Sequence, residues 1–182
     1  MARKVLRVNA LSMSSIEKLK KQLEEYNLSL TNRCKTFVQK LALVGLNVAS
    51  VNANQSPLGH YIHFNVTNEQ LPDGAKAILV MDGDVLENDL YEPFNTALAI
   101  EFGAGIHYNP TPNPNADKLG FGVGTFPGQT HAFDKNGWYF WDEKTETWKH
   151  SYGVKATMPM YKAYETMFLE AEKIAREVFG NV

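Results

Sequence analysis

The sequence has a single cysteine, Cys34, and no long hydrophobic run. One cysteine excludes a disulfide within the chain, and its place in a helical pattern indicates a small buried hydrophobe in a reducing cytosol. No stretch of about 18 apolar residues is present, so the sequence predicts no transmembrane helix. The basic N-terminus, residues 1–9, lacks the apolar core of a signal peptide.

Recognisable catalytic motifs are also missing. The sequence contains no His-Glu-x-x-His and no clustered cysteines, so its five histidines point only weakly to a metal site. The spaced glycines of residues 120–124 are followed by Thr125-Phe126-Pro127-Gly128 instead of a helix, which argues against a nucleotide-binding loop. We therefore expect no metal, no cofactor, no catalytic residue and no small-molecule substrate.

The size and charge of the chain suggest one domain with two unlike ends. Its 182 residues, 44% hydrophobic and 21% charged, are ordinary for a single globular domain over residues 1–182. Residues 1–50 contain nine basic and three acidic residues, a net of +6, and residues 51–182 contain nine and seventeen, a net of −8. Opposite signs favour head-to-tail contact between copies. A solvated basic helix face explains the same counts.

A long first helix is predicted from apolar residues spaced by three and four between about 15 and 49, with Ser14 or Ser15 as its cap. At 1.5 Å per residue it would be about 50 Å long, which is more than a small domain needs. We expect that it either kinks, near Asn27 or Gly45, or projects and packs against a neighbouring subunit.

The last helix is predicted from the same spacing. Thr157 is a suitable N-cap, Pro159 suits the first helical position, and the apolar pattern ends at Phe179-Gly180. In the middle of the chain, residues 91–102 are ambiguous, and we favour a short helix that begins near Pro93. Gly103 would then end this helix with a left-handed conformation.

Strands are predicted from alternating apolar residues. Residues 60–66 and 76–82 form an antiparallel pair around a turn at Pro72-Asp73-Gly74, and the second strand is the more buried. Residues 3–9 form a short strand, while residues 50–59 and 109–115 form loops. The predicted fold is α+β: the long N-terminal helix and the C-terminal helix pack on a small, mostly antiparallel sheet with long Gly/Pro-rich loops.

A predicted hairpin of residues 138–142 and 147–152 is rich in aromatic side chains. Alternation along its strands would bury about half of these side chains and expose the other half. Core packing accounts for the buried half. A subunit interface would account for the rest, because Trp and Tyr are favoured anchors at interfaces.

Glu101 lies near the C-terminal end of the short predicted helix, where the helix dipole favours a cation. We therefore expect the carboxylate to have a partner. The candidates are a backbone amide, or a Lys or Arg on the same or a neighbouring chain.

Taken in order, these pieces resemble the bacteriophage tail-component family of tail-completion and head–tail joining proteins. An apolar segment ends in Glu-Phe-Gly-x-Gly, a Gly-Trp-aromatic strand follows, and a Gly-x-x-Ala-x-x-Pro-Met step starts the last helix. The matching residues are Glu101, Phe102, Gly103, Gly105, Gly137, Trp138, Tyr139, Gly153, Ala156, Pro159 and Met160. The sequence departs from the family at Ala104, where Thr is usual, and in the Pro/Asn loop after Gly105.

The resemblance implies a structural virion protein of the neck or tail, present in the host cytoplasm during assembly, and no enzyme. Its partners would be copies of itself in a ring, expected to be a hexamer, and neighbouring neck and tail proteins, with DNA close by in the channel and no membrane. Changes at Trp138 or Glu101 would weaken assembly more than folding. The candidate interface residues are Glu101, Phe102, Gly103, Gly105, Trp138, Tyr139, Trp141, Gly153, Pro159 and Met160.

Two other classes of protein remain open. A small metal-assisted hydrolase would use the histidines. A nucleic-acid-binding module would use the basic first 50 residues, and its DNA affinity would fall with salt.

Overall fold

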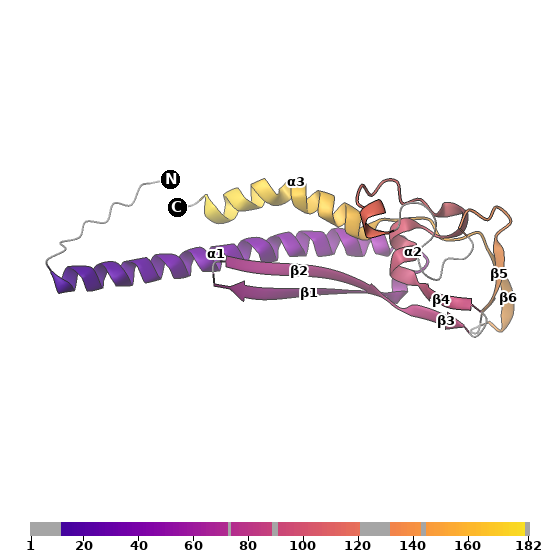
Figure 1. The fold of residues 1–182 in the computed structure, drawn as a ribbon, viewed down its shortest axis with the longest axis horizontal. Coiled ribbons are helices and arrows are strands. Elements are labelled where there is room, and N and C mark those ends of the chain that lie inside the picture. Colours follow the sequence, from indigo (N-terminus) through magenta and orange to yellow (C-terminus); the bar gives the residue numbers. More distant parts are fainter. Residues whose placement is uncertain (1–11, 73, 89–90, 121–131, 143–144, 181–182) are drawn as a thin grey trace.

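The structure is a computed structural model that describes residues 12–72, 74–88, 91–120, 132–142 and 145–180. The predicted strand at residues 3–9 lies outside this part of the chain. The described elements form an elongated α+β molecule, as the sequence predicts (Figure 1). Helix α3 (Pro159–Phe179) lies along one side of helix α1 (Met13–Ala53), and the hairpin of strands β1 (Ile62–Leu71) and β2 (Gly74–Gly83) lies along another (Figure 1).

Helix α1 (Met13–Ala53) is one helix of 41 residues, about 60 Å long. The helix runs through Asn27 and Gly45 without interruption. Of the two predicted alternatives, a kinked helix or a projecting one, the structure therefore shows a projecting helix. Residues 50–53, predicted as loop, continue the helix because Ala53 packs in the core.

The cap of α1 differs from the predicted one. Ser12, and neither Ser14 nor Ser15, is the N-cap residue, and its Oγ accepts a bond from the Ser15 N–H at 3.4 Å. A serine side chain in this position satisfies one of the free amides of the first turn. The helix therefore begins two residues before the predicted start, about residue 15.

Small residues let α1 pack closely between its two neighbours. A Cβ on Gly45 would come within 2.6 Å of Met167 Sδ in α3 (Pro159–Phe179) and 3.2 Å of Leu79 Cδ2 in β2. The alanines of the same stretch of α1 are buried as well. This half of α1 is therefore the centre of the helical core.

Strands β1 (Ile62–Leu71) and β2 (Gly74–Gly83) pair antiparallel with Leu71 opposite Gly74, so the predicted antiparallel pair is confirmed. Asp73 of the predicted turn lies outside the described residues. Residues of β1 at 62, 64 and 66 are half-buried on one face, as predicted. The second strand is the more buried, as predicted: six residues of β2 are buried or half-buried, against three of β1. Every second side chain of β2 is exposed, because α1 covers only one face of the hairpin.

The region of residues 91–102 is half strand and half helix. Strand β3 (Val85–Asn88) pairs with β4 (Tyr91–Asn95), and α2 (Thr96–Phe102) begins only after Asn95, whose Oδ1 accepts a bond from the Leu98 N–H at 3.0 Å. Pro93 therefore lies in a strand and does not begin the helix. Gly103 ends α2 with a positive φ of 81°, as predicted, but its ψ of 171° is extended and not left-handed helical.

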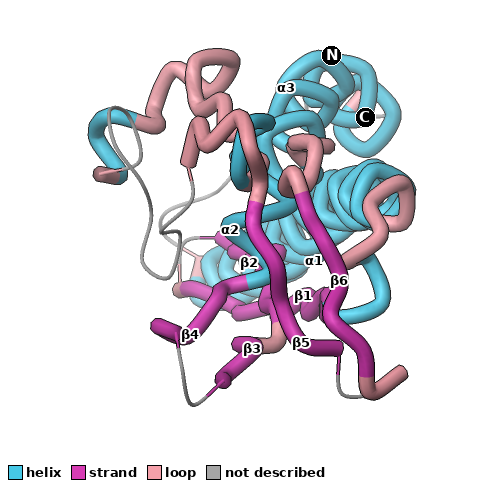
Figure 2. Tube along the Cα trace, turned by 90° about the vertical axis from the view of Figure 1, so that its right-hand side faces the viewer, coloured by secondary structure: helices cyan, strands magenta, loops and turns pink. Residues whose placement is uncertain are grey.

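Strands β5 (Trp138–Asp142) and β6 (Thr147–Ser151) form the predicted hairpin at the far end of the molecule from the start of α1 (Figure 1). Viewed along the molecule from that end, β5 and β6 lie in front of the two long helices (Figure 2). The described strands thus form three separate two-stranded sheets and not one small sheet. Short 3-10 turns occur in the connections, at Gly59–Tyr61, Gly105–His107 and Asp117–Leu119.

Candidate functional site

Two of the sequence motifs meet as paired backbone segments. Ala104 and Val154 exchange two backbone bonds, at 2.8 and 3.2 Å, and the Ile106 N–H donates to the Tyr152 carbonyl at 3.1 Å. The segment after α2 therefore lies alongside the segment after β6, although the two are about fifty residues apart. We call residues 101–106 and 153–161 the hub.

Glycines make this close approach possible. A Cβ on Gly153, whose φ is 110°, would overlap the carbonyl oxygen of Ala104. A Cβ on Gly105 would come within 2.6 Å of Trp138 Cζ3 and would also overlap the carbonyl oxygen of Tyr152. Because only glycine lacks a Cβ and tolerates these positive φ values, the residue type is dictated by backbone contact.

Glu101 joins α2 to the start of α3. Its Oε2 accepts a bond from the Met160 N–H at 3.0 Å, and its Oε1 accepts one from the Tyr161 N–H at 2.9 Å. These amides lie in the first turn of α3, where they have no partner within the helix. The predicted partner is therefore a pair of backbone amides of the same chain, and the helix dipole stabilises the carboxylate there.

The surroundings of Glu101 act on its charge in opposite directions. Burial raises the pKa of the Glu101 carboxyl above its ordinary value. The amides of Met160 and Tyr161, together with the positive charge of Lys162, lower that pKa and offset part of the rise. Lys162 also donates to Asn52 Oδ1 of α1 at 2.8 Å, which ties this end of α3 to the core.

The start of α3 corrects one prediction and confirms another. Pro159 is the first residue of the helix, as predicted. Thr157 is not the cap: Met158 holds the N-cap position with a φ of 53°, and the buried Thr157 hydroxyl has no hydrogen-bond partner among the described residues. Glu101 supplies the bonds that a local cap would otherwise provide.

The structure divides the predicted interface residues into three groups. Tyr139 and Trp141 are exposed, whereas Trp138, Gly153 and Met160 are partly buried. The others are buried inside the chain's own fold, where they shape the subunit, so their exposure gives no support to an interface role, which stays a prediction. These residues are Glu101, Phe102, Gly103, Gly105 and Pro159.

One face of the β5–β6 hairpin is a row of exposed rings. In the antiparallel register Tyr139 lies opposite His150 and Trp141 lies opposite Trp148, so these four share a face. Trp141 and Trp148 pack edge to face with centroids 5.7 Å apart, and His150 packs against Tyr139 at 4.6 Å. Tyr152 continues the row beyond His150 at 4.6 Å. We call these five residues the aromatic face; all are exposed, Trp148 by 59%.

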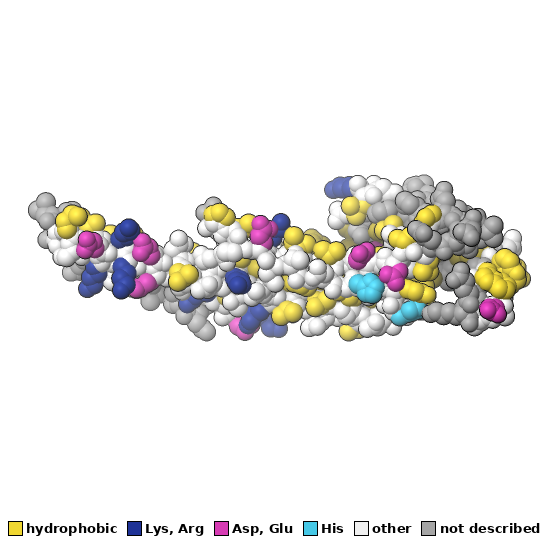
Figure 3. Space-filling view, turned by 90° about the horizontal axis from the view of Figure 1, so that it is seen from below, with side chains coloured by type: hydrophobic (Ala, Val, Ile, Leu, Met, Phe, Trp, Pro, Cys, Tyr) yellow, Lys and Arg dark blue, Asp and Glu magenta, His cyan; other side chains and the backbone are white. Residues whose placement is uncertain are grey.

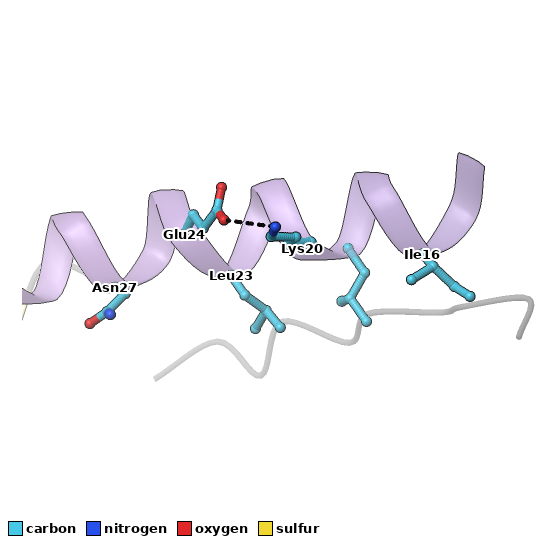
Figure 4. Close-up of a pocket in the computed structure, with 6 residues that line it drawn as sticks. Ile16, Lys20, Leu23, Glu24 and Asn27 are labelled. Atoms are coloured by element: carbon cyan, nitrogen blue, oxygen red, sulfur yellow. Dashed lines mark ion pairs between the residues drawn. The ribbon is translucent and has the colours of Figure 1, made fainter. Parts of the chain in front are cut away.

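A second exposed apolar surface lies at the opposite end of the molecule. Ile16, Leu19, Leu23, Tyr26 and Leu30 fall on one side of α1, and we call them the α1 stripe; all are exposed except Leu19, which is half-buried. The first three line a shallow hollow together with Lys20, Glu24 and Asn27 (Figure 4). Lys20 and Glu24 form an ion pair at 3.9 Å beside it. Figure 3 shows hydrophobic side chains at the β5–β6 end and clustered charged side chains at the α1 end.

Sequence reasoning missed two parts of this arrangement. His150 and Tyr152 belong to the aromatic row, but neither was predicted from the sequence to be part of it. Trp148, His150 and Tyr152 follow one another at a spacing of two, which places their side chains on one face of a strand and could have revealed them. The contact between Gly153 and Ala104 has no local signal, because it joins distant segments.

Within the part of the chain that the structure describes, no three His, Cys, Asp or Glu side chains lie together in a way that could hold a metal ion. None of the described helices has an apolar stretch long enough to cross a bilayer. Comparison with known proteins gave no match among family models, curated proteins or solved structures.

Proposed function

We propose that this chain is a structural subunit of a bacteriophage particle, which completes the tail or joins it to the head as part of a ring. The observation that carries the proposal is the distribution of exposed apolar side chains: the α1 stripe lies at one end of an elongated molecule and the aromatic face at the other. Contiguous exposed apolar surface is typical of interaction sites. The ordered motifs between Glu101 and Met160, which resemble the tail-component family, favour the same class of protein.

The packing of the motif residues supports a structural role. The glycines of the hub let two backbone segments touch, and Glu101 fixes the start of α3. Residues used in this way give a subunit its shape and leave its outer surfaces free to contact neighbours.

The mechanism that follows is assembly by repeated contact between copies. Identical subunits that meet through unlike surfaces close into a ring when the rotation between neighbours allows it, and a hexamer would match a tail of sixfold symmetry. Neighbouring neck and tail proteins would bind the two sides of the ring. The net charge of −8 over residues 51–182 would repel DNA and let it slide through the channel.

Electron microscopy of phage particles tests this proposal. A phage from which the gene for this chain is deleted should produce separate filled heads and finished tails, and the gene supplied from a plasmid should restore joined particles. Joined, infectious particles from the deletion phage would rule the proposal out.

A further inference from the structure

The β1–β2 hairpin has two long edges that no described strand covers. Its strands have ten residues each and pair without a shift of register from Ile62–Gly83 to Leu71–Gly74. In an antiparallel ladder every second residue directs its N–H and C=O away from the partner strand. Among the described residues, no backbone bond links residues 63–82 to backbone outside the hairpin, and neither strand pairs with a third one. Each edge is therefore a row of donors and acceptors on which another strand can pair.

Strand β1 also lacks the features that commonly protect an edge. Lysine, proline, bulges and short length discourage edge-to-edge pairing in native proteins. Residues 62–71 contain no Lys, Arg, Pro or Gly, and their ladder with β2 has no bulge. The smaller β3–β4 sheet differs, because β4 contains Pro93 and the ladder shifts register between Leu86 and Asn88. The hairpin is thus the one of these two sheets that is suited to extension.

We propose that the free edge of β1 in one copy pairs with the free edge of β2 in the next copy, an inference that rests on the ring assembly proposed above. Within the chain, β2 already matches β1 along its whole length, and this match selects another copy of the chain as the partner. Wherever a residue of β1 points its backbone groups outward, the residue opposite it on β2 does the same. Repeating the register between copies therefore brings donors to acceptors along both strands.

The same register keeps the faces of the sheet aligned. Directly opposite residues of an antiparallel pair lie on one face. Within the chain, the half-buried residues of β1 at 62, 64 and 66 lie opposite residues of β2 that are buried or half-buried. Pairing between copies in this register would place these residues beside one another again, on the face that α1 covers. A slip of one residue would move the covered side chains of one strand to the exposed face.

Charged residues at the two edges are few, and the register pairs them by sign. Glu69 is the only acidic or basic residue of β1 apart from a histidine, and it pairs with Lys76 at 3.5 Å within the chain. In the repeated register Glu69 of one copy lies opposite Lys76 of the next, and His63 lies opposite Asp82. No two like charges are opposed. Because the paired edges are unlike, each added copy presents a new free edge, and the assembly grows until it closes.

Disulfide trapping tests the register directly. Thr67→Cys and Ile78→Cys are made in separate chains, each with Cys34→Ser, and are mixed under mild oxidation. The two positions are exposed and directly opposite in the ladder, so the mixed disulfide should exceed either homodimer by roughly tenfold. Val80→Cys replaces Ile78→Cys as the control, because Val80 is 44% exposed against 40% for Ile78 but lies two residues out of register with Thr67.

A second variant tests the edge in solution. Asn65→Lys with Thr67→Lys adds like charges at exposed positions of β1 and leaves the covered face unchanged. Its dissociation constant for self-association should be about tenfold higher than that of wild type. Leu169→Lys, at a position of α3 that is 76% exposed, should associate as wild type does. Analytical ultracentrifugation measures the constants, and far-UV circular dichroism checks that every variant is folded. If wild type is monomeric at the highest concentration reached, the trapping decides alone.

Each outcome decides the proposal. A mixed disulfide no more abundant than with the Val80→Cys control, as expected if the edge receives a strand of another protein, would overturn the pairing. A preference for homodimers of either cysteine variant, or a double-lysine variant that associates as well as wild type, would also overturn it. Failure of the pairing in a chain that still forms oligomers would leave the phage function standing. A deletion phage with normal particles would instead remove the function, whatever the purified protein does.

Discussion

The hub and the aromatic face lie on opposite sides of one strand and are built by opposite rules. Trp138 in β5 packs against Gly105 of the hub, whereas Tyr139, the next residue, points outward into the aromatic face. In the hub, contact between backbone segments dictates where glycine is needed, and the carboxylate of Glu101 bonds to amides of the same chain. On the aromatic face large rings are held in a row without cover. Changes in the hub should therefore break the subunit, and changes on the face should break what the subunit contacts.

The largest effect on folding is expected from Gly153→Ala. The new methyl group would overlap the carbonyl oxygen of Ala104 and separate the paired segments, so we expect a loss of about 3 kcal/mol or more in the free energy of unfolding. Gly120→Ala is the matched control, because Gly120 also has a positive φ, 83°, but a Cβ added there would meet no atom within 4 Å. Its cost should be about 1 kcal/mol. Urea unfolding followed by circular dichroism measures both, and equal costs would show that contact in the hub is unimportant.

Glu101→Ala should come next. It leaves the partly buried amides of Met160 and Tyr161 without this acceptor, and hydrogen bonds to a charged group typically contribute about 1.5–3 kcal/mol each. We expect a loss of about 2–4 kcal/mol in a monomeric chain, so the prediction that Glu101 matters more for assembly than for folding is replaced by its reverse. Glu172→Ala removes an exposed pairing with Arg176 and should cost about 0.5 kcal/mol or less. A Glu101→Ala chain that is stable but fails to assemble would return Glu101 to an assembly role.

Acidity should change stability through the same carboxyl. Because the pKa of Glu101 is raised on folding, the folded state binds a proton more tightly than the unfolded state. Its contribution to stability is therefore fully present below the ordinary value of 4.5 and is lost as the pH rises through the raised pKa. As the pH rises through that window, the unfolding free energy of wild type should fall relative to that of Glu101→Gln. A difference that does not change with pH, or that moves the other way, would contradict this assignment.

Local periodicity explains what the sequence could predict. Helices α1 and α3, the β1–β2 pair and the β5–β6 hairpin each follow from apolar spacing within one segment. The alternation of the last hairpin also predicts that half of its rings are exposed. Pro93 misleads the prediction of the middle region, because proline is accepted in the first turn of a helix and also on an edge strand. Strand β4 is such an edge strand.

Contacts between distant segments explain what the sequence could not predict. The cap of α3 comes from Glu101, 59 residues before Met160, so no motif near Thr157 could reveal it. The poor fit of a carboxylate at the end of α2 does predict that Glu101 has a partner, but it cannot choose between an amide and a cation. Five of the predicted interface residues are buried in the fold, which the sequence could not reveal, because a recurring motif does not tell whether it faces inward or outward.

A small effect on folding is expected on the aromatic face, with Trp148→Ala. Trp148 is 59% exposed and packs edge to face with Trp141, a geometry that contributes about 0.5–1.5 kcal/mol. We expect a loss of about 1 kcal/mol, measured by urea unfolding with circular dichroism, since removing a tryptophan alters the fluorescence. Phe102→Ala, at a position that is only 3% exposed, should cost about 3–5 kcal/mol under the same conditions. If Trp148→Ala cost as much as Phe102→Ala, the rings would be part of the fold, and the contrast between the hub and the aromatic face would fail. If its cost is small, the fold leaves this row of rings unexplained, and their reason must lie in a contact outside the chain.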